Sequence, residues 1–130
     1  MIMVNSAEEK FVFVDAVAQF NGEGLGIKVI ISADINSKNK LLEYFKERLR
    51  FPYFGMNWDA LQDCLRDLSW LEEKEVFVIH EGLPVLPPED LKIYLSVLSD
   101  TVENWKVEPE KVFRVIFPRT LRSRVIEGFR

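Results

Sequence analysis

Four short runs along the chain are made mostly of apolar residues, at residues 11–14, 27–32, 75–79 and 112–117. Each run is rich in β-branched or aromatic side chains and is too short for a buried helix, so each predicts a β-strand. The segment at 75–79 is apolar after its first residue, Glu75, which is typical of a strand buried on both faces of a parallel sheet.

Between these runs the apolar positions recur at helical spacing. A first helix is predicted to begin after Asn36 or Ser37, which can cap it, and to stop near residue 50 because Pro52 follows. A second runs from Asn57 to about residue 70, and a third from Pro88 to about residue 105. The second helix has one apolar stripe, made by Ala60, Leu61, Cys64, Leu65 and Leu68.

The alternation of strands and helices predicts right-handed βαβ crossovers and a small parallel sheet, so the fold class is α/β. A hairpin between the strands at 11–14 and 27–32 is plausible across the glycine-rich loop at 21–26. No repeat or long linker interrupts the pattern. We therefore expect one domain over residues 1–130.

Composition supports a soluble, cytoplasmic protein. The chain has 130 residues, 48% of them hydrophobic and 29% charged, which are globular proportions. No apolar run approaches the ~20 residues that span a bilayer, and residues 1–10 do not resemble a secretory signal. The one cysteine, Cys64, has no internal partner for a disulfide, which favours a reducing compartment.

The net charge of −4 is unevenly distributed. Residues 51–75 hold six acids and two bases, and residues 89–110 hold the same numbers, whereas residues 111–130 hold six bases and one acid. An acidic middle argues against direct nucleic-acid binding by the body of the protein. The basic tail at 119–130 is the one place for such contact, and we expect it to be frayed or docked on the protein itself.

Candidate catalytic and cofactor residues are few. His80 ends a predicted strand without a serine or cysteine motif near it, and Cys64 lies on the apolar stripe of its helix. Gly22, Gly24 and Gly26 precede a strand, whereas a pyrophosphate loop connects a strand to a helix. We predict no enzyme activity, no cofactor and no metal site.

The second predicted helix carries an unusual row of acids. Asp59, Asp63 and Asp67 are spaced by four and share one face, where like charges cost ~0.2–0.5 kcal/mol per pair. Three interpretations stay open: a solvated acidic face, a set of carboxylates for a cationic partner, or a metal or dicarboxylate site. The last needs ligands from other elements, because one straight helix cannot surround an ion.

The residues from Tyr53 to Leu65 read Tyr-Phe-Gly-Met-Asn-Trp-Asp-Ala-Leu-Gln-Asp-Cys-Leu. This segment resembles the signature of the barstar family, bacterial intracellular inhibitors of barnase-type ribonucleases. The family pattern has an aromatic pair, Gly-x-Asn, an apolar residue, Asp-Ala-Leu, an aromatic residue and Asp-Cys-Leu. The resemblance covers about residues 27–118 and leaves out residues 1–26, with their added strand, and the tail at 119–130.

The resemblance implies a barstar-like three-layer α/β fold and a non-enzymatic antitoxin or immunity protein that blocks a ribonuclease active site. Asp63 would be the central anchor of the interface and Asp59 its neighbour. The other implied contact residues are Tyr53, Asn57, Gln62, Asp67 and, on the third helix, Asp100.

Two departures from the family pattern keep other functions open. Gln62 stands where the family has an aromatic residue, and Arg66 would repel a cationic enzyme. One alternative is an interaction module whose partner is not a ribonuclease. Another is an accessory protein that contacts RNA through its basic tail.

Overall fold

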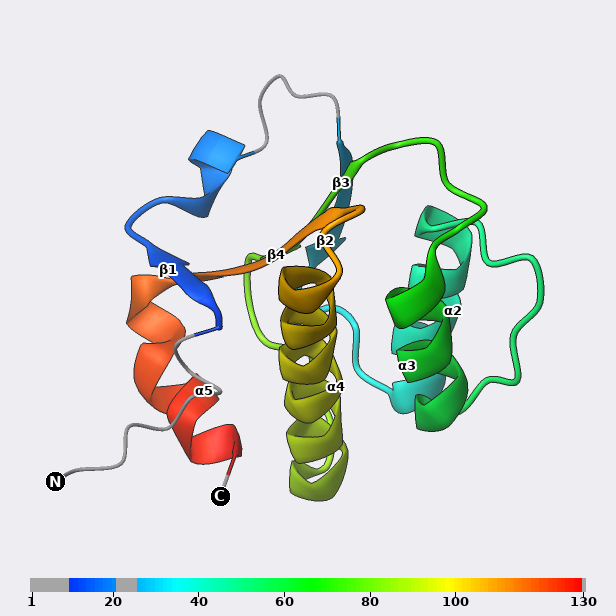
Figure 1. Ribbon diagram of the computed structural model, residues 1–130. Coiled ribbons are helices and arrows are strands. Elements are labelled where there is room, and N and C mark those ends of the chain that lie inside the picture. Colours follow the sequence, from blue (N-terminus) through cyan, green and yellow to red (C-terminus); the bar gives the residue numbers. More distant parts are fainter. Residues whose placement is uncertain (1–9, 21–25, 130) are drawn as a thin grey trace, which may run out of the picture.

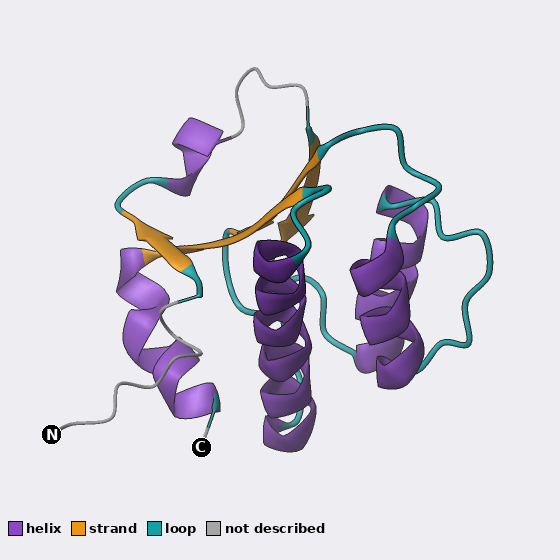
Figure 2. Ribbon diagram, in the orientation of Figure 1, coloured by secondary structure: helices purple, strands orange, loops and turns teal. Residues whose placement is uncertain are grey.

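The computed structural model describes residues 10–20 and 26–129 and confirms the α/β class (Figure 2). The helices and strands alternate for most of the chain. In chain order they are β1 (Val12–Val14), η1 (Val17–Phe20), β2 (Ile27–Ile31), α2 (Lys38–Arg48), α3 (Trp58–Asp67), β3 (Glu75–His80), α4 (Pro88–Val107), β4 (Val112–Pro118), η2 (Arg119–Leu121) and α5 (Arg122–Gly128).

The four strands form one parallel sheet in the order β1-β4-β3-β2. The helices α2, α3, α4 and α5 lie on one side of this sheet, and the short helix η1 lies on the other (Figure 1). Parallel strands need crossover connections, and α2, α3 and α4 provide them between β2, β3 and β4.

Successive side chains along each strand point to opposite faces of the sheet. Val29, Val78 and Val115 stand in register across three strands, are fully buried and belong to the main hydrophobic core. Ile79 and Ile116 point to the opposite face and are also fully buried, in the part of β3 and β4 that η1 contacts. The small helix thus covers the second face where the sheet would otherwise expose isoleucine to water.

The expected hairpin between the first two strands is wrong. β1 and β2 lie at opposite edges of the sheet, and β1 pairs in parallel with β4, from Val12 opposite Ile116 to Val14 opposite Pro118. The helix η1 follows β1 at once and prevents a direct turn back. The glycine-rich loop falls mostly at residues 21–25, outside the described residues.

His80 is a buried structural residue, as its sequence context predicted. Its Nδ1 lies 3.0 Å from the carbonyl oxygen of Ile116, which can only accept, so Nδ1 carries the hydrogen. Its Nε2 therefore accepts from the hydroxyl of Tyr94 at 2.7 Å, and its ring stacks on Phe117. Burial lowers the pKa of His80 to about 3, so a neutral imidazole joins β3, β4 and α4.

The two ends of the described chain pack on each other beside β4. Phe11 contacts the rings of Phe117 and Phe129, and Arg119 donates to Asp15 at 2.9 Å. The residues expected as a basic tail form η2 and α5, and α5 docks on α4. The ring contacts of Phe11 and the ion pair between Arg119 and Asp15 lie beside β1, away from the acidic face of α3.

Candidate partner-binding site

The loop before α3 ends in a side chain that caps the helix and contains a residue with a left-handed backbone. Asn57 is the N-cap, and its side-chain oxygen accepts from the backbone N–H of Ala60 at 2.7 Å, as the sequence predicted. Met56, directly before the cap, has φ 52°, in the left-handed region that costs a side chain about 1 kcal/mol or more. The first turn of α3 is therefore held in a defined direction.

The helix α3 ends at Asp67, three residues before the predicted end near residue 70. Leu68 adopts a left-handed conformation, with φ 51° and ψ 19°, and its N–H donates to the carbonyl of Cys64. A left-handed residue after a helix is usually glycine, and no glycine marks this stop. Because Leu68 is fully buried, its packing compensates for the unfavourable backbone.

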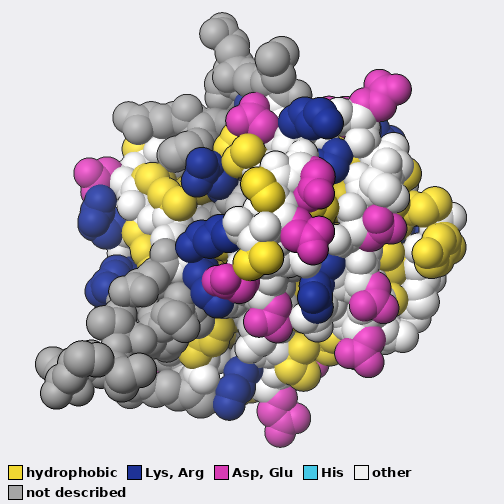
Figure 3. Space-filling model, in the orientation of Figure 1, with side chains coloured by type: hydrophobic (Ala, Val, Ile, Leu, Met, Phe, Trp, Pro, Cys, Tyr) yellow, Lys and Arg dark blue, Asp and Glu magenta, His cyan; other side chains and the backbone are white. Residues whose placement is uncertain are grey.

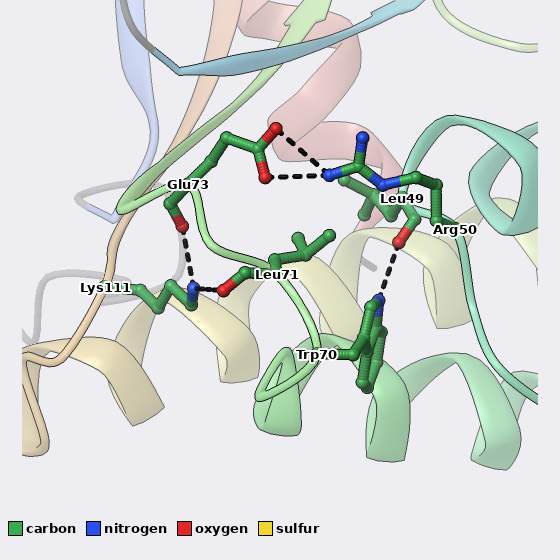
Figure 4. Close-up of polar contacts among 6 residues, drawn as sticks. All are labelled: Leu49, Arg50, Trp70, Leu71, Glu73 and Lys111. Carbon is green, nitrogen blue, oxygen red and sulfur yellow. Dashed lines mark hydrogen bonds and ion pairs between the residues drawn. The ribbon is translucent and has the colours of Figure 1, made fainter.

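Three contacts fasten the loop that follows α3 (Figure 4). The ammonium of Lys111 donates to the carbonyls of Leu71 and Glu73, both at 2.7 Å, and burial lowers its pKa. The indole N–H of Trp70 donates to the carbonyl of Leu49 at 2.8 Å.

The third contact is an ion pair. Arg50, itself at φ 54°, reaches both carboxylate oxygens of Glu73 and lowers the pKa of that acid. Sequence reasoning missed this set of residues, because their partners are backbone carbonyls or lie more than twenty residues away. Together the contacts fix where α3 ends.

The inner face of α3 packs on α4. Leu61 and Leu65 are fully buried, and the indole N–H of Trp105 on α4 donates to the carbonyl of Leu65 at 2.9 Å. Cys64 is buried on this helix, as its stripe predicted, and burial together with the charges of Asp63 and Asp67 raises the pKa of its thiol. The cysteine is thus a packing residue and a poor nucleophile.

The outer face of α3 carries Asp59, Asp63 and Asp67, which we call the acidic ridge. All three are exposed, and within residues 10–20 and 26–129 their side chains make no hydrogen bond or ion pair. In Figure 3, acidic side chains are scattered over the right half of the view, with lysine and arginine side chains among them. Asp59 lies in the first turn, where the helix dipole favours it, whereas Asp67 ends the helix, where the dipole opposes it.

A groove of about 270 Å³ runs between the acidic ridge and the loop before α3. Asp63 and Asp67 line it together with Tyr53, whose side chain is 78% exposed. The structure therefore brings three of the predicted contact residues together around one hollow. Asp59 and Asn57 lie outside its lining, at the start of the helix.

The other predicted residues line a second groove, of about 470 Å³, between α3 and α4. Here the amide of Gln62 donates to a carboxylate oxygen of Asp100 at 3.2 Å. Arg66 reaches across the same groove to the side-chain oxygen of Asn104 at 3.4 Å. The two grooves share no lining residue, so the predicted site consists of two adjacent parts, with Arg66 among acids in the second.

The described part of the chain has neither a metal-ligand cluster nor a membrane-spanning helix. No three histidine, cysteine, aspartate or glutamate side chains there converge as ligands for a metal ion. None of the described helices combines the length and apolar character needed to cross a bilayer. The described residues thus form an exposed, acidic helix flanked by two grooves, which is the candidate site.

Residues 25–118 match the family of Barstar (barnase inhibitor), and the chain belongs to this family. The match includes β2 to β4 and the whole of α3, and it confirms the family resemblance of the Tyr53–Leu65 segment. Proteins of this family are inhibitors and not enzymes. Comparison with curated proteins and with solved structures finds no match. The strand β1 and the helix α5 lie outside the matched residues.

Proposed function

We propose that this protein inhibits a basic ribonuclease of the barnase type by placing the acidic ridge of α3 against the cations that would hold RNA phosphate. The carrying observation is that Asp59, Asp63 and Asp67 are exposed, repel one another and make no ion pair with the described residues. A helix that serves only stability gains nothing from this arrangement. A cationic partner turns the repulsion into attraction.

The support around the ridge fits this role. The N-cap at Asn57, the stop at Leu68 and the Lys111 contacts hold α3 before any partner arrives. A preformed helix loses little entropy on binding, which favours affinity. The concentrated negative potential also attracts a basic enzyme and can raise the association rate ~10–10³-fold.

Within this proposal each predicted residue has a place. Asp63 is the central anchor because it lies in the middle of the ridge and lines the groove beside Tyr53. Tyr53 offers an exposed aromatic ring, and Asn57 borders the surface while capping the helix. Gln62 and Asp100 form the neighbouring polar part through their hydrogen bond.

The test is a titration of barnase activity and a binding measurement with wild type, Asp63→Ala and Glu43→Ala. Glu43 is a matched control because it is an exposed acid in the middle of α2, away from the ridge. We expect Asp63→Ala to weaken binding by about 2–5 kcal/mol, with an unchanged or higher thermal midpoint. Glu43→Ala should bind as wild type does.

Equal inhibition by all three proteins would contradict the role of the ridge. So would a large loss of stability in Asp63→Ala with binding intact. A cytoplasmic location is part of the proposal, because the inhibitor must meet the enzyme where cellular RNA is exposed.

A second candidate is a binding module for a partner that is not a ribonuclease. Arg66 favours it, because this exposed cation lies in the groove between α3 and α4, on the surface that would meet a basic enzyme. A pull-down from the native host with wild type, Asp63→Ala and Arg66→Ala separates the two. Recovery of a small basic nuclease by wild type alone supports the inhibitor, and recovery of an acidic protein that depends on Arg66 supports the module.

A further inference from the structure

A second charged region lies on the opposite flank of α4, and it is basic. A hollow of about 290 Å³ is lined by Lys10, Lys106, Lys111 and Arg114, with no acid among its lining residues. Lysine and arginine side chains gather on this face, left of its centre (Figure 3). In a protein with net charge −4, four cations around one hollow are a local reversal of sign.

The four cations differ in how they are held. Lys111 is buried and fixed on the carbonyls of Leu71 and Glu73, and Lys10 pairs with Glu103 at 3.4 Å with only 17% of its side chain exposed. Lys106 and Arg114 are exposed, and in the part of the chain that the structure describes their side chains have no ion pair or hydrogen bond. Lys10 and Lys111 are thus held in place by the protein, whereas Lys106 and Arg114 can contact a ligand.

Beside the hollow, the added strand β1 pairs with only the last three residues of β4. β1 pairs with β4 only from Ile116 to Pro118, whereas β3 pairs with β4 from Val112. Among the described residues, the β1-side edge of β4 is therefore open at residues 112–114. The N–H of Val112 donates toward the β3 side, to Lys74, so the N–H of Phe113 points away from β3.

The rest of the lining is apolar. Trp105, Pro109, Val102 and the 37% exposed Val112 form walls between the charged groups. Clustered cations suit a doubly charged oxyanion better than a single carboxylate, and the arginine fork fits a phosphate. The apolar walls suit an organic body attached to it, and the volume is at the small end of ligand pockets.

From these observations we propose that the hollow between β1, β4 and the end of α4 binds a small organic phosphate, a phosphate monoester with an apolar or planar body. Lys106 and Arg114 contact the phosphate, and Lys10 and Lys111 supply fixed positive charge. The site lies across α4 from the acidic ridge and is independent of the proposed inhibition.

The test uses the full chain and adenosine 5′-monophosphate as the probe, with binding followed by calorimetry and by amide chemical shifts at low salt. Lys106→Ala and Arg114→Ala should each weaken binding by about tenfold or more, the loss expected for one charge-assisted hydrogen bond. Lys46→Ala is the matched control, because Lys46 is likewise an exposed lysine in the last turn of a helix. It should bind the probe as wild type does, as should Asp63→Ala.

Two comparison ligands identify the source of the phosphate. Inorganic phosphate should bind more weakly than the mononucleotide, and equal affinity would overturn the role of the apolar walls. A single-stranded RNA without terminal phosphate should bind no better than the mononucleotide. Much tighter binding of the RNA would overturn the proposal and show that this region is a nucleic-acid-binding surface. Absence of saturable binding, or equal weakening in Lys46→Ala, would overturn the proposal.

Discussion

The neighbouring helices α3 and α4 use their side chains in opposite ways. In α4, polar groups are buried and paired: Tyr94 with His80, and the hydroxyl of Thr101 with the carbonyl of Val97 at 2.8 Å. In α3, the acids remain in water without partners among the described residues, and the backbone is left-handed just before the helix at Met56 and just after it at Leu68. The long helix stabilises the fold, and the short one presents charge from it.

This difference teaches how a small domain supports an unfavourable surface. Strained residues and unpaired like charges persist only where the surroundings determine them. Here the surroundings are the packing on α4, the buried leucine that ends α3 and the carbonyl contacts of Lys111. The predictions below act first on α4, then on the connection between the two helices, and last on α3.

The largest effect is expected at His80, the sheet partner of α4, on acidification. Its pKa is about 3 when folded, against 6.5 for the free side chain, so the unfolded chain binds the extra proton as the pH falls below 6.5. The free energy of unfolding should therefore decline between pH 6.5 and 3, by roughly 5 kcal/mol from this group.

Urea titrations across this range with wild type and His80→Gln measure the difference, since the carboxylates contribute equally to both proteins. The ring shifts of His80 should also stay those of a neutral imidazole down to about pH 4. Identical pH slopes in the two proteins, or a ring that titrates near 6.5, would contradict the buried pair.

A smaller effect is expected at Lys111, which connects the two regions. Lys111→Met keeps the stem but leaves the carbonyls of Leu71 and Glu73 without their donor, so we expect a loss of about 2 kcal/mol. Amide exchange in the last turn of α3 should accelerate more than exchange in the middle of α4. The control is Lys74→Met, an exposed lysine of the same loop, and equal losses in both variants would argue against the contact.

The smallest effects should separate the two ends of the acidic ridge. Asp59→Asn removes a charge that the helix dipole favours but Asp63 opposes, so the two effects partly cancel and we expect a loss of at most about 0.5 kcal/mol. Asp67→Asn removes a charge that the dipole and Asp63 both oppose, and should stabilise by a similar amount. Urea denaturation at low and high salt measures both changes, which should shrink as salt rises. A common sign for the two variants would show that local packing outweighs the dipole.

Sequence patterns predicted what depends on near neighbours. The starts of α2 and α3 followed from Ser37 and Asn57, whose side chains accept from the backbone three residues on. The spacing of Asp59, Asp63 and Asp67 placed them on one exposed face, because helical geometry alone decides this. The parallel sheet followed from the alternation of elements.

What the sequence could not predict depends on distant partners. A run of apolar residues indicates a strand but not its neighbour, so the pairing of β1 with β4 was missed. The end of α3 at Leu68 is not marked by a glycine. In the sequence Lys111 is one of several basic residues near the end of the chain, and only the structure shows that it binds backbone carbonyls. The division of the contact residues between two grooves likewise depends on how α3 packs on α4.

The pairing of β1 with β4 also sets an order of events during synthesis. β1 leaves the ribosome about a hundred residues before the strand it pairs with, and Phe11 waits still longer for Phe129. Contacts this distant in sequence close late, because the intervening chain must first be brought together. The domain from β2 to β4 can therefore collapse first, with the edge of β4 briefly exposed to other nascent chains. Docking of β1 then covers residues 116–118 of that edge.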